Sequence, residues 1–370
     1  MKGIQGVDVK GKRVFVRADF NVPISNGKVA DSFRIEKTLE TIQYLVAGGA
    51  HIILASHIEN DAGENSLRPV YEYLQEKFPM EFVCEYYPNT PVELGHAFEN
   101  GKIVLLENLR KYEGEKNNDD VFAKHLSSFA DIFVNESFAT SHRRHASLVK
   151  IPTYIPAYAG IVFEQEVTEL SRAFHPEHPF LFILGGAKFE TKLPLIQKFF
   201  ALADKVFIGG ALANDFLKAK GVNTGISLLS KGNISVAEFL TDKLILPVDV
   251  RVKTADGVKV KKIEEIDDGD FIVDVGPQTI ESMDSIILDS KFILWNGPLG
   301  NYEIGFKDST LELAKKIANS SAMSIVGGGD TVASIAELGL SSKFSFISTG
   351  GGAMLDFLAN ETLPGIEALG

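Results

Sequence analysis

The chain of 370 residues has a single cysteine, Cys84, and no hydrophobic run of membrane-spanning length. One cysteine excludes an intramolecular disulfide and a cysteine-based zinc site, and we expect Cys84 to be a small buried hydrophobic side chain. The N-terminal stretch MKGIQGVDVKGKRVFVRADF lacks the continuous apolar segment of a secretion signal. These absences predict a cytoplasmic protein that does not associate with a membrane.

An excess of positive charge is also lacking. The chain has 37 Lys and Arg against 49 Asp and Glu, so its formal net charge is −12. Proteins that bind nucleic acids or membrane surfaces generally present a basic face, and this balance argues against both partners while leaving room for a local basic pocket. The length and a hydrophobic content of 45% suffice for two domains, each with its own core.

No Gly/Ser-rich or Pro-rich linker separates the halves, and short β-type runs alternate with amphipathic stretches throughout. This alternation predicts an α/β protein with two doubly wound parallel sheets, of the Rossmann-like kind. We place the domain boundary near IPTYIPAYAG (151–160), followed by an interdomain helix over 158–174. The expected strands are 13–17, 51–55, 81–85, 102–107 and 131–135 in the first half, and 179–186, 205–210, 243–249, 270–276, 292–297, 324–329 and 344–352 in the second.

Six of the seven runs in the second half end in glycine, as ILGG, FIGG, DVG, WNG, VGGG and STGGG. In open parallel sheets, ligands bind beyond the carboxyl ends of the strands, where the backbone must approach them closely. The glycines therefore indicate a ligand-binding edge. The alternative for any one of them is a tight turn between strand and helix.

The phosphate-binding pattern GxxxxGK[ST] is absent, and no GxGxxG follows a first strand with an acidic residue after it. The stretch MSIVGGGDTVASIAEL (323–338) nevertheless offers backbone N–H groups at a helix start, and Asp330 could hold Mg²⁺. As an alternative, Asp330 or Thr331 would be a plain N-cap. In LGGAKFETK (184–192), Lys188 and Lys192 oppose the helix dipole unless an anion such as a nucleotide polyphosphate binds there. Otherwise they are ordinary surface lysines.

Polar and basic residues gather after the strands of the first half. Because parallel strands end at one edge of a sheet, we expect them to meet and to bind a small substrate that carries carboxylate and phosphate groups. The alternatives are a metal site made by His57, His142 and His145, or a solvated basic face. The residues are Arg17, Asp19, Asn21, Arg34, His57, Arg110, His142, Arg143, Arg144 and His145.

The runs VRADFNVP, LLENLR, SHRRHAS, LGGAK, WNGPLG, IVGGGDT and ISTGGGA occur in this order over nearly the whole chain. Together they resemble the phosphoglycerate kinase family. The resemblance implies reversible phosphoryl transfer between 1,3-bisphosphoglycerate with MgADP and 3-phosphoglycerate with MgATP, in a protein that we expect to be a monomer with hinge closure. It also implies a substrate domain (1–157) onto which a tail (357–370) packs, and a nucleotide domain (175–356).

The resemblance implies a role for each matching residue. Arg34 and Lys188 would steady the transferring phosphoryl group, and Lys192, Gly328 and Gly329 would assist at the nucleotide phosphates. The 3-phosphoglycerate contacts would be Asp19, Asn21, Arg34, His57, Asn60, Arg110, His142, Arg143 and His145. The ATP or ADP contacts would be Lys192, Gly209, Gly210, Gly276, Asn296, Gly328, Gly329 and Thr331, with Glu303 at the ribose and Asp330 as the Mg²⁺ ligand.

The chain departs from the family pattern in two segments. Where the family usually reads SHLGRP, this chain reads SHIEND, so that Glu59 and Asn60 replace glycine and a substrate-binding arginine. NESFATSHRRHAS also differs from the usual NDAFGTAHRAHAS. The added Arg144 either compensates for the lost arginine or points to solvent beside a carboxylate such as Glu136. The alternatives for function are a catalytically silent relative kept for binding, or a kinase of the same fold for another small acid.

Overall fold

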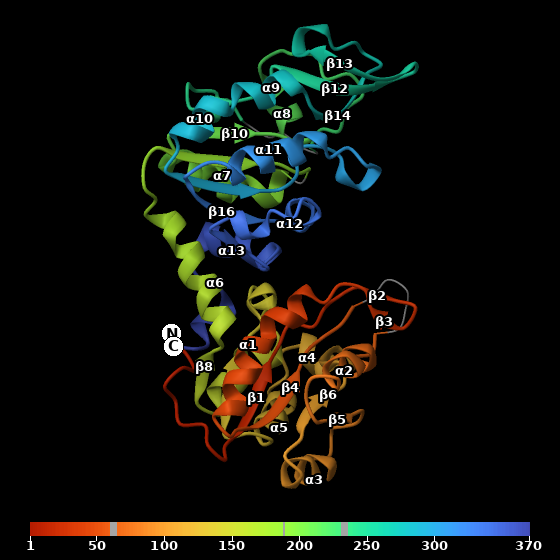
Figure 1. Cartoon of the computed structure of the whole chain (residues 1–370), viewed down its shortest axis with the longest axis vertical. Coiled ribbons are helices and arrows are strands. Elements are labelled where there is room, and N and C mark those ends of the chain that lie inside the picture. The colour runs from red at the N-terminus through yellow and green to blue at the C-terminus, as the bar shows by residue number, and fades with distance from the viewer. Residues whose placement is uncertain (60–64, 188, 231–235) are drawn as a thin grey trace. The chain divides into compact units, whose positions relative to one another are not determined.

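A computed structural model describes residues 1–59, 65–187, 189–230 and 236–370. Two of the predicted site residues, Asn60 and Lys188, lie outside these ranges. The chain divides into two compact units: unit 1 comprises Met1–Thr168 and Asn360–Gly370, and unit 2 comprises Glu169–Ala359. Both chain ends therefore belong to unit 1 (Figure 1). Helix α6 (Ile161–Ser171) begins in unit 1 and ends in unit 2.

Unit 1 is built on a six-stranded parallel sheet in the order β5-β6-β4-β1-β7-β8. Its four central strands are almost wholly buried, as in RVFVR, because helices cover parallel sheets and leave no solvent face. The strands are β1 (Arg13–Arg17), β4 (His51–Ala55), β5 (Met80–Val83), β6 (Ile103–Leu106), β7 (Ile132–Asn135) and β8 (Ala157–Ala159), with a hairpin of β2 (Ile24–Ser25) and β3 (Lys28–Val29). The helices are α1 (Phe33–Ala47), α2 (Arg68–Leu74), α3 (Glu93–Glu99), α4 (Glu113–Lys116), α5 (Asp120–Ser127) and α14 (Pro364–Glu367).

Unit 2 has a second six-stranded parallel sheet, in the order β11-β10-β9-β15-β16-β17. The strand order reverses between β9 and β15, which makes that junction the expected ligand position. The strands are β9 (Phe180–Leu184), β10 (Lys205–Ile208), β11 (Leu244–Ile245), β15 (Phe292–Asn296), β16 (Met323–Gly327) and β17 (Phe346–Ile347). The helices are α7 (Phe189–Leu202), α8 (Leu212–Ala219), α9 (Pro277–Ser282), α10 (Asp284–Asp289), α11 (Asp308–Ala318), α12 (Gly329–Glu337) and α13 (Gly352–Asn360).

The two parallel sheets confirm the predicted fold class, but two local expectations were wrong. Strand β14 (Phe271–Val275) does not join the parallel sheet; it pairs with β12 (Asp249–Thr254) in an antiparallel sheet completed by β13 (Gly257–Lys262). The turn residues ADG at 255–257 close the hairpin between β12 and β13 and were the signal for it. Cys84 is exposed, not buried.

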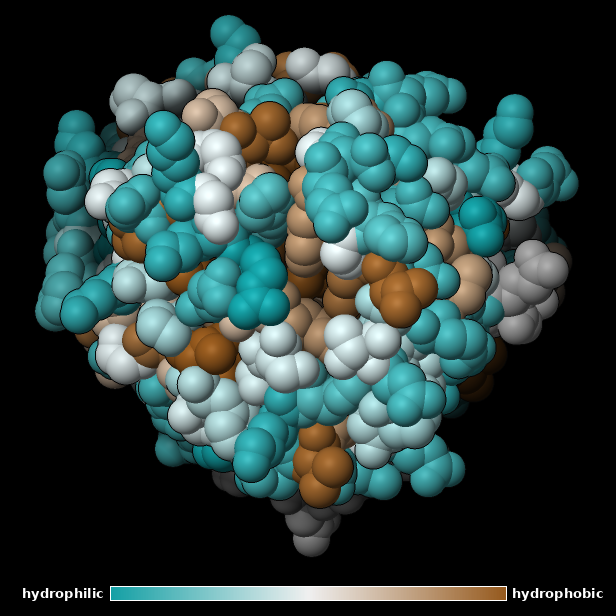
Figure 2. Space-filling model, turned by 90° about the horizontal axis from the view of Figure 1, so that it is seen from below, coloured by the Kyte–Doolittle hydropathy of each residue, from teal (hydrophilic) through white to brown (hydrophobic). Residues whose placement is uncertain are grey.

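Some large hydrophobic side chains are exposed at the surface. Figure 2 shows one face of the molecule, on which hydrophilic side chains predominate and hydrophobic ones form separate small groups. Exposed Val46, Val92 and Val121 are far apart in the sequence of unit 1. Of the helices in the part of the chain that the structure describes, none is both long and apolar enough to span a bilayer.

The start of α6 is fixed by a buried carboxyl group. Glu136, just after β7, accepts hydrogen bonds from Thr41 Oγ1 at 2.6 Å and from the backbone N–H groups of Val162 and Phe163 at 3.1 Å. A Cβ on Gly160 would overlap this carboxyl group, so the residue before the helix must be glycine. Burial raises the pKa of Glu136 to about 7 against the opposing effect of these hydrogen bonds, with Glu40 adding a small further rise.

This shift predicts that Glu136 makes the protein less stable as the pH rises. The folded chain holds the proton up to about pH 7, whereas the unfolded chain loses it near pH 4.5, so stability falls between these values. The free energy of unfolding of the wild type, relative to Glu136→Gln, is expected to fall by about 2–3 kcal/mol from pH 5 to pH 8. Urea unfolding followed by circular dichroism measures this difference. The exposed Glu99→Gln should show no such trend, and equal slopes for all three proteins would contradict the prediction.

Candidate functional sites in the two units

The centre of the unit 1 site is Arg17, which ends β1 and is fully buried. Its Nε donates to Ser147 Oγ at 2.8 Å, and one terminal nitrogen lies 3.4 Å from His57 Nδ1. Ser147 donates in turn to the buried carboxylate of Glu115, through Oγ at 2.6 Å and the backbone N–H at 2.9 Å. We call Arg17, Ser147 and Glu115 the buried charge network. This network holds the Arg17 side chain in place, and the other basic residues of the site lie around it.

The loop after β1 is joined to α1 and to the loop after β4. Arg34 on α1 forms an ion pair with Asp19 at 3.0 Å, and Asp19 also accepts from the backbone N–H of Asn21. The side-chain oxygen of Asn21 accepts from the backbone N–H of Glu59 at 2.9 Å. The structure thus brings together three predicted site residues, Asp19, Asn21 and Arg34, and joins them to Glu59 in the loop after β4.

Two predicted histidines show that the arginines converge. Burial, followed by the charges of Arg17, Arg110, Arg143 and Arg34, holds the pKa of His57 well below its ordinary value. Burial and three of the same arginines lower the pKa of His145 to about 4. Both imidazoles are therefore neutral at pH 7, and their surroundings carry a concentrated positive charge suited to an anion.

Other predicted residues lie around this cluster. Arg143 Nε is 3.4 Å from His142 Nε2, and Arg110 forms an ion pair with Glu59. Arg144 is exposed and lies 3.7 Å from Glu367 of the C-terminal segment. The suggested pairing of Arg144 with Glu136 was wrong, because Glu136 is buried at the start of α6. The described residues include no group of three or more His, Cys, Asp or Glu side chains that could hold a metal, so the histidine metal site gains no support.

In unit 2, the glycines lie where neighbouring loops pack closely. A Cβ on Gly185 would overlap the carbonyl group of Pro298, so the loops after β9 and β15 can approach only because this residue is glycine. Gly328 has φ +98° and is the N-cap of α12, with no side-chain capping hydrogen bond. Asp330 and Thr331 lie inside that helix, so the plain N-cap alternative was wrong. The first N–H groups of α12 have no side-chain acceptor at the cap, as an anion site requires.

Lys192 on α7 is the cation at this edge. It is 7% exposed, and its Nζ donates to Asn296 Oδ1, at the end of β15, at 2.9 Å. Burial lowers the pKa of Lys192 to about 8. No carboxylate among the described residues forms an ion pair with it within 4 Å. A buried ammonium group with only an amide partner is poorly compensated, and a phosphate oxygen would supply the missing charge.

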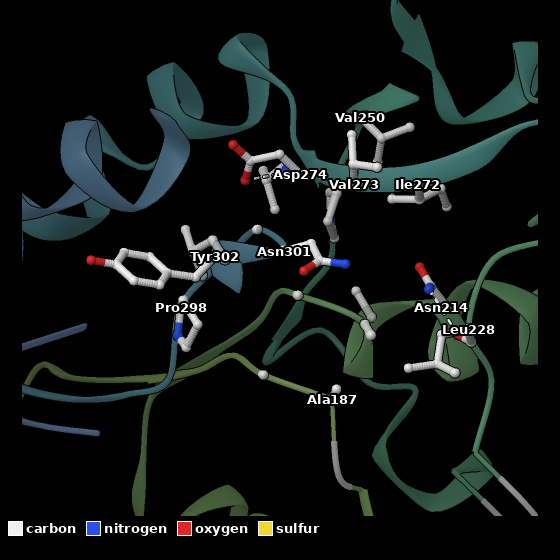
Figure 3. A pocket seen from close by; sticks show the side chains of 18 of the residues that line it. Ala187, Asn214, Leu228, Val250, Ile272, Val273, Asp274, Pro298, Asn301 and Tyr302 are labelled. Carbon is white, nitrogen blue, oxygen red and sulfur yellow. Dashed lines mark hydrogen bonds between the residues drawn. The ribbon is translucent and has the colours of Figure 1, made fainter. Parts of the chain in front are cut away.

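A cavity of about 480 Å³ lies beside Lys192. Figure 3 shows Val250, Ile272 and Val273 from β12 and β14 on one side, and Asn214 and Leu228 on another. Of the predicted residues, Gly210, Lys192, Glu303 and Asp330 line it. Gly209, Gly276, Asn296, Gly328, Gly329 and Thr331 are not part of its described lining; Gly276 packs instead against Asp249.

Two acidic residues, Glu303 and Asp330, line this cavity. Partial burial and then the charge of Glu303 raise the pKa of Asp330. Such a carboxylate, beside a second one, favours a cation. Sequence reasoning did not single out Ser147 or Glu115, nor the polar lining residues Asn214, Asp274 and Asn301. Ser147 and Asp274 belong to the recognised runs SHRRHAS and DVG, and Asn301 follows WNGPLG, whereas Glu115 had no signal.

Arginines gather on one α/β unit, and a glycine-rich strand edge with a buried lysine and an adjoining cavity lies on the other; these are the features expected of a kinase of small molecules. The family model "Phosphoglycerate kinase" matches residues 4–361. Phosphoglycerate kinases of Leptospira biflexa serovar Patoc and Rubrobacter xylanophilus are 41% and 40% identical, and the alignments cover 98% and 100% of this chain and 96% and 98% of the relatives.

Solved structures of phosphoglycerate kinases also resemble this chain over nearly its whole length. The phosphoglycerate kinase of Coxiella burnetii has a TM-score of 0.85 at 35% identity, with 99% of this chain and 97% of that chain covered. That of Pyrococcus horikoshii OT3 has a TM-score of 0.84 at 30% identity, with 100% and 98% covered. The chain belongs to the phosphoglycerate kinase family. It is an enzyme that transfers a phosphoryl group reversibly between 1,3-bisphosphoglycerate with ADP and 3-phosphoglycerate with ATP, as the sequence predicted.

Proposed function

We propose that unit 1 binds the acyl substrate and that unit 2 binds the nucleotide. The observation that carries the proposal is the contrast in chemistry between the sites. Burial and then the charges of four arginines lower the pKa of His57 in unit 1; a site surrounded by arginines suits a small substrate bearing carboxylate and phosphate. A poorly compensated lysine and a partly apolar cavity occur together in unit 2, which suits a polyphosphate attached to a base.

Within unit 1, Arg34, Arg110, Arg143 and the neutral His57 would bind 3-phosphoglycerate, with Asp19 and Asn21 holding Arg34 in place. Asp19 and Asn21 both contact Arg34, by an ion pair at 3.0 Å and by a backbone carbonyl at 3.4 Å. The buried charge network would support this site from beneath. Asn60, His142 and His145 complete the proposed set. Arg144 is not included, because its contact is with Glu367.

Within unit 2, Lys192 and the backbone of Gly328–Thr331 would bind the nucleotide phosphates, and Lys188 would act on the transferring group. Asp330 would hold Mg²⁺, with Glu303 at the ribose. The residues present fit this ion, because magnesium binds one or two carboxylates together with substrate phosphates, and Asp330 and Glu303 line the same cavity. When bound, the ion would neutralise charge on the phosphates.

Phosphoryl transfer leaves little covalent work for the protein, because the transition state is loose and both acceptors are already ionised at pH 7. The residues would therefore position the two substrates and stabilise negative charge. Since the reacting atoms must approach to roughly 3–3.5 Å, we propose that the units close on each other during the cycle, with α6 in the hinge region. We also propose that the protein is a cytoplasmic monomer without nucleic-acid or membrane partners.

Reciprocal substitutions test the assignment. Arg34→Gln is expected to raise the KM for 3-phosphoglycerate by about 10-fold to 10²-fold and to leave the KM for ATP nearly unchanged, because it removes a charged hydrogen bond to the acyl substrate. Asp330→Asn should do the opposite and should abolish the increase in ADP affinity that Mg²⁺ produces in calorimetry. If either variant changed both KM values equally, the division of binding between the units would be wrong.

A further inference from the structure

Glu59 places a carboxylate of the chain itself in the anion site of unit 1. Its backbone N–H donates to Asn21 Oδ1 at 2.9 Å, so the residue is anchored beside the proposed substrate contacts. One carboxylate oxygen forms an ion pair with Arg110, and the other lies 2.9 Å from Lys116 Nζ. Glu59 therefore bridges one proposed substrate-binding cation and one cation outside that set.

The two ends of this bridge differ in exposure. The Arg110 side chain is 3% exposed, whereas those of Glu59 and Lys116 are 46% and 53% exposed. Burial lowers the pKa of Arg110, which means that its charge is held in an unfavourable environment. Glu59 makes the largest contribution in the opposite direction, through its hydrogen bond and its charge. The hydrogen bond with Lys116, followed by that with Arg110, lowers the pKa of Glu59 and keeps it ionised.

Glu107 is the other acidic residue described around the cavity that Arg110 lines, and it already has its own hydrogen-bond partners. Glu59, Arg110, Lys111, Lys116 and Glu107 line a cavity of about 350 Å³. The Glu107 carboxylate accepts hydrogen bonds from Ser66 Oγ and from the backbone N–H groups of Leu67 and Asn108, at 2.7–2.8 Å. Among the described lining residues, Glu59 is thus the carboxylate that contacts the guanidinium group of Arg110.

We propose that Glu59 is an internal competitor for the acyl substrate and thereby sets its affinity and specificity. In the free protein its carboxylate occupies Arg110; when an anionic group of 3-phosphoglycerate binds Arg110, Glu59 swings away and keeps only its ion pair with Lys116. The proposal rests on the assignment of Arg110 to the substrate. A dianionic phosphate competes with the carboxylate better than a monoanionic group, so the site favours phosphorylated acids over plain carboxylic acids.

The full-length Glu59→Gln variant tests the competition. Binding of 3-phosphoglycerate without nucleotide, measured by calorimetry, is expected to become about tenfold tighter, since a half-exposed ion pair no longer has to be broken. The KM for 3-phosphoglycerate should fall equally, and the KM for ATP should not change. Glu113→Gln, which removes an exposed carboxylate at the start of α4, is the matched control and should bind as the wild type does. Unchanged or weaker binding by Glu59→Gln would overturn the proposal.

A double-mutant cycle tests the role of Lys116. Lys116→Met should weaken 3-phosphoglycerate binding when Glu59 is present, because Arg110 is then the only cation that Glu59 can pair with and Glu59 competes more strongly for it. The same change should have no effect when Glu59 is already Gln. The same effect in both backgrounds would mean that Lys116 binds the substrate directly, which contradicts the proposed exchange. Arg110→Gln, made in the Glu59→Gln background, tests whether Arg110 binds the substrate at all. If this change does not weaken 3-phosphoglycerate binding, the proposed substrate site is wrong. If it does weaken binding, but Glu59→Gln alone does not tighten binding, only the proposed competition is rejected.

Discussion

Lys192→Met is expected to weaken ADP and ATP binding by about 10²-fold and to make the nucleotide-free protein more stable. Both effects have one cause. The ammonium group is buried with an amide oxygen as its hydrogen-bond partner, and burial lowers its pKa to about 8. Methionine has nearly the same length and no charge. The variant therefore loses a charged hydrogen bond to phosphate, worth about 1.5–3 kcal/mol, and gains about 2 kcal/mol of stability.

The pH dependence of the free energy of unfolding tests independently whether burial of Lys192 destabilises the nucleotide-free protein. The folded chain releases the Lys192 proton near pH 8, whereas the unfolded chain holds it to about pH 10.4, so the stability of the nucleotide-free wild type rises between these values. That rise should be absent in Lys192→Met.

Trp295, the single tryptophan, is buried in unit 2 next to Asn296. We therefore expect its fluorescence to change on unfolding and use it as the measurement of stability, with calorimetry for nucleotide binding. The exposed Lys218→Met is the control. Normal nucleotide affinity in Lys192→Met would show that Lys192 does not bind the nucleotide.

Glu115→Gln is expected to cause a large loss of stability, about 3–5 kcal/mol. Arg17 and Glu115 are both fully buried and are linked through Ser147. Burial lowers the pKa of Arg17, and Glu115 is the first of the groups that oppose this effect. The two charges compensate each other across Ser147 without a direct ion pair, so removal of Glu115 leaves the buried Arg17 without its main opposing charge, which costs far more than loss of a surface pair.

The neighbouring Glu113→Gln provides the comparison, since it makes the same change on the same helix at an exposed position. Urea unfolding measures both variants, and their free energies of unfolding should differ by at least 2 kcal/mol. The double variant Arg17→Met with Glu115→Met should recover much of the stability while losing 3-phosphoglycerate binding. Equal stability of the two single variants would show that Glu115 does not compensate Arg17.

The sequence predicted the parallel sheets because strand-like runs such as PFLFIL alternate with amphipathic helical stretches through both halves. It could not distinguish β14 from a parallel strand, since FIVDV has the same composition as its neighbours and only its partner β12 decides its sheet. The sequence also predicted that basic residues such as Arg17 and Arg110 lie at or just after strand ends, as they do at β1 and β6. Their counter-ions were not predictable: Glu59 and Glu115 acquire their partners through contacts between segments 51 and 32 residues apart in the chain.

The path of the chain makes unit 2 an insertion within unit 1. The chain enters unit 2 at Glu169 and returns at Asn360, and its last eleven residues belong to unit 1. There the backbone N–H of Gly365 donates to the Ser141 carbonyl at 2.9 Å, next to the loop that carries His142 and Arg143. Unit 2 is therefore one uninterrupted segment that can form its core from its own residues in a single passage of the chain. Unit 1 lacks some of its contacts until Asn360–Gly370 have returned to it, so its folding depends on pairing segments separated by the whole of unit 2.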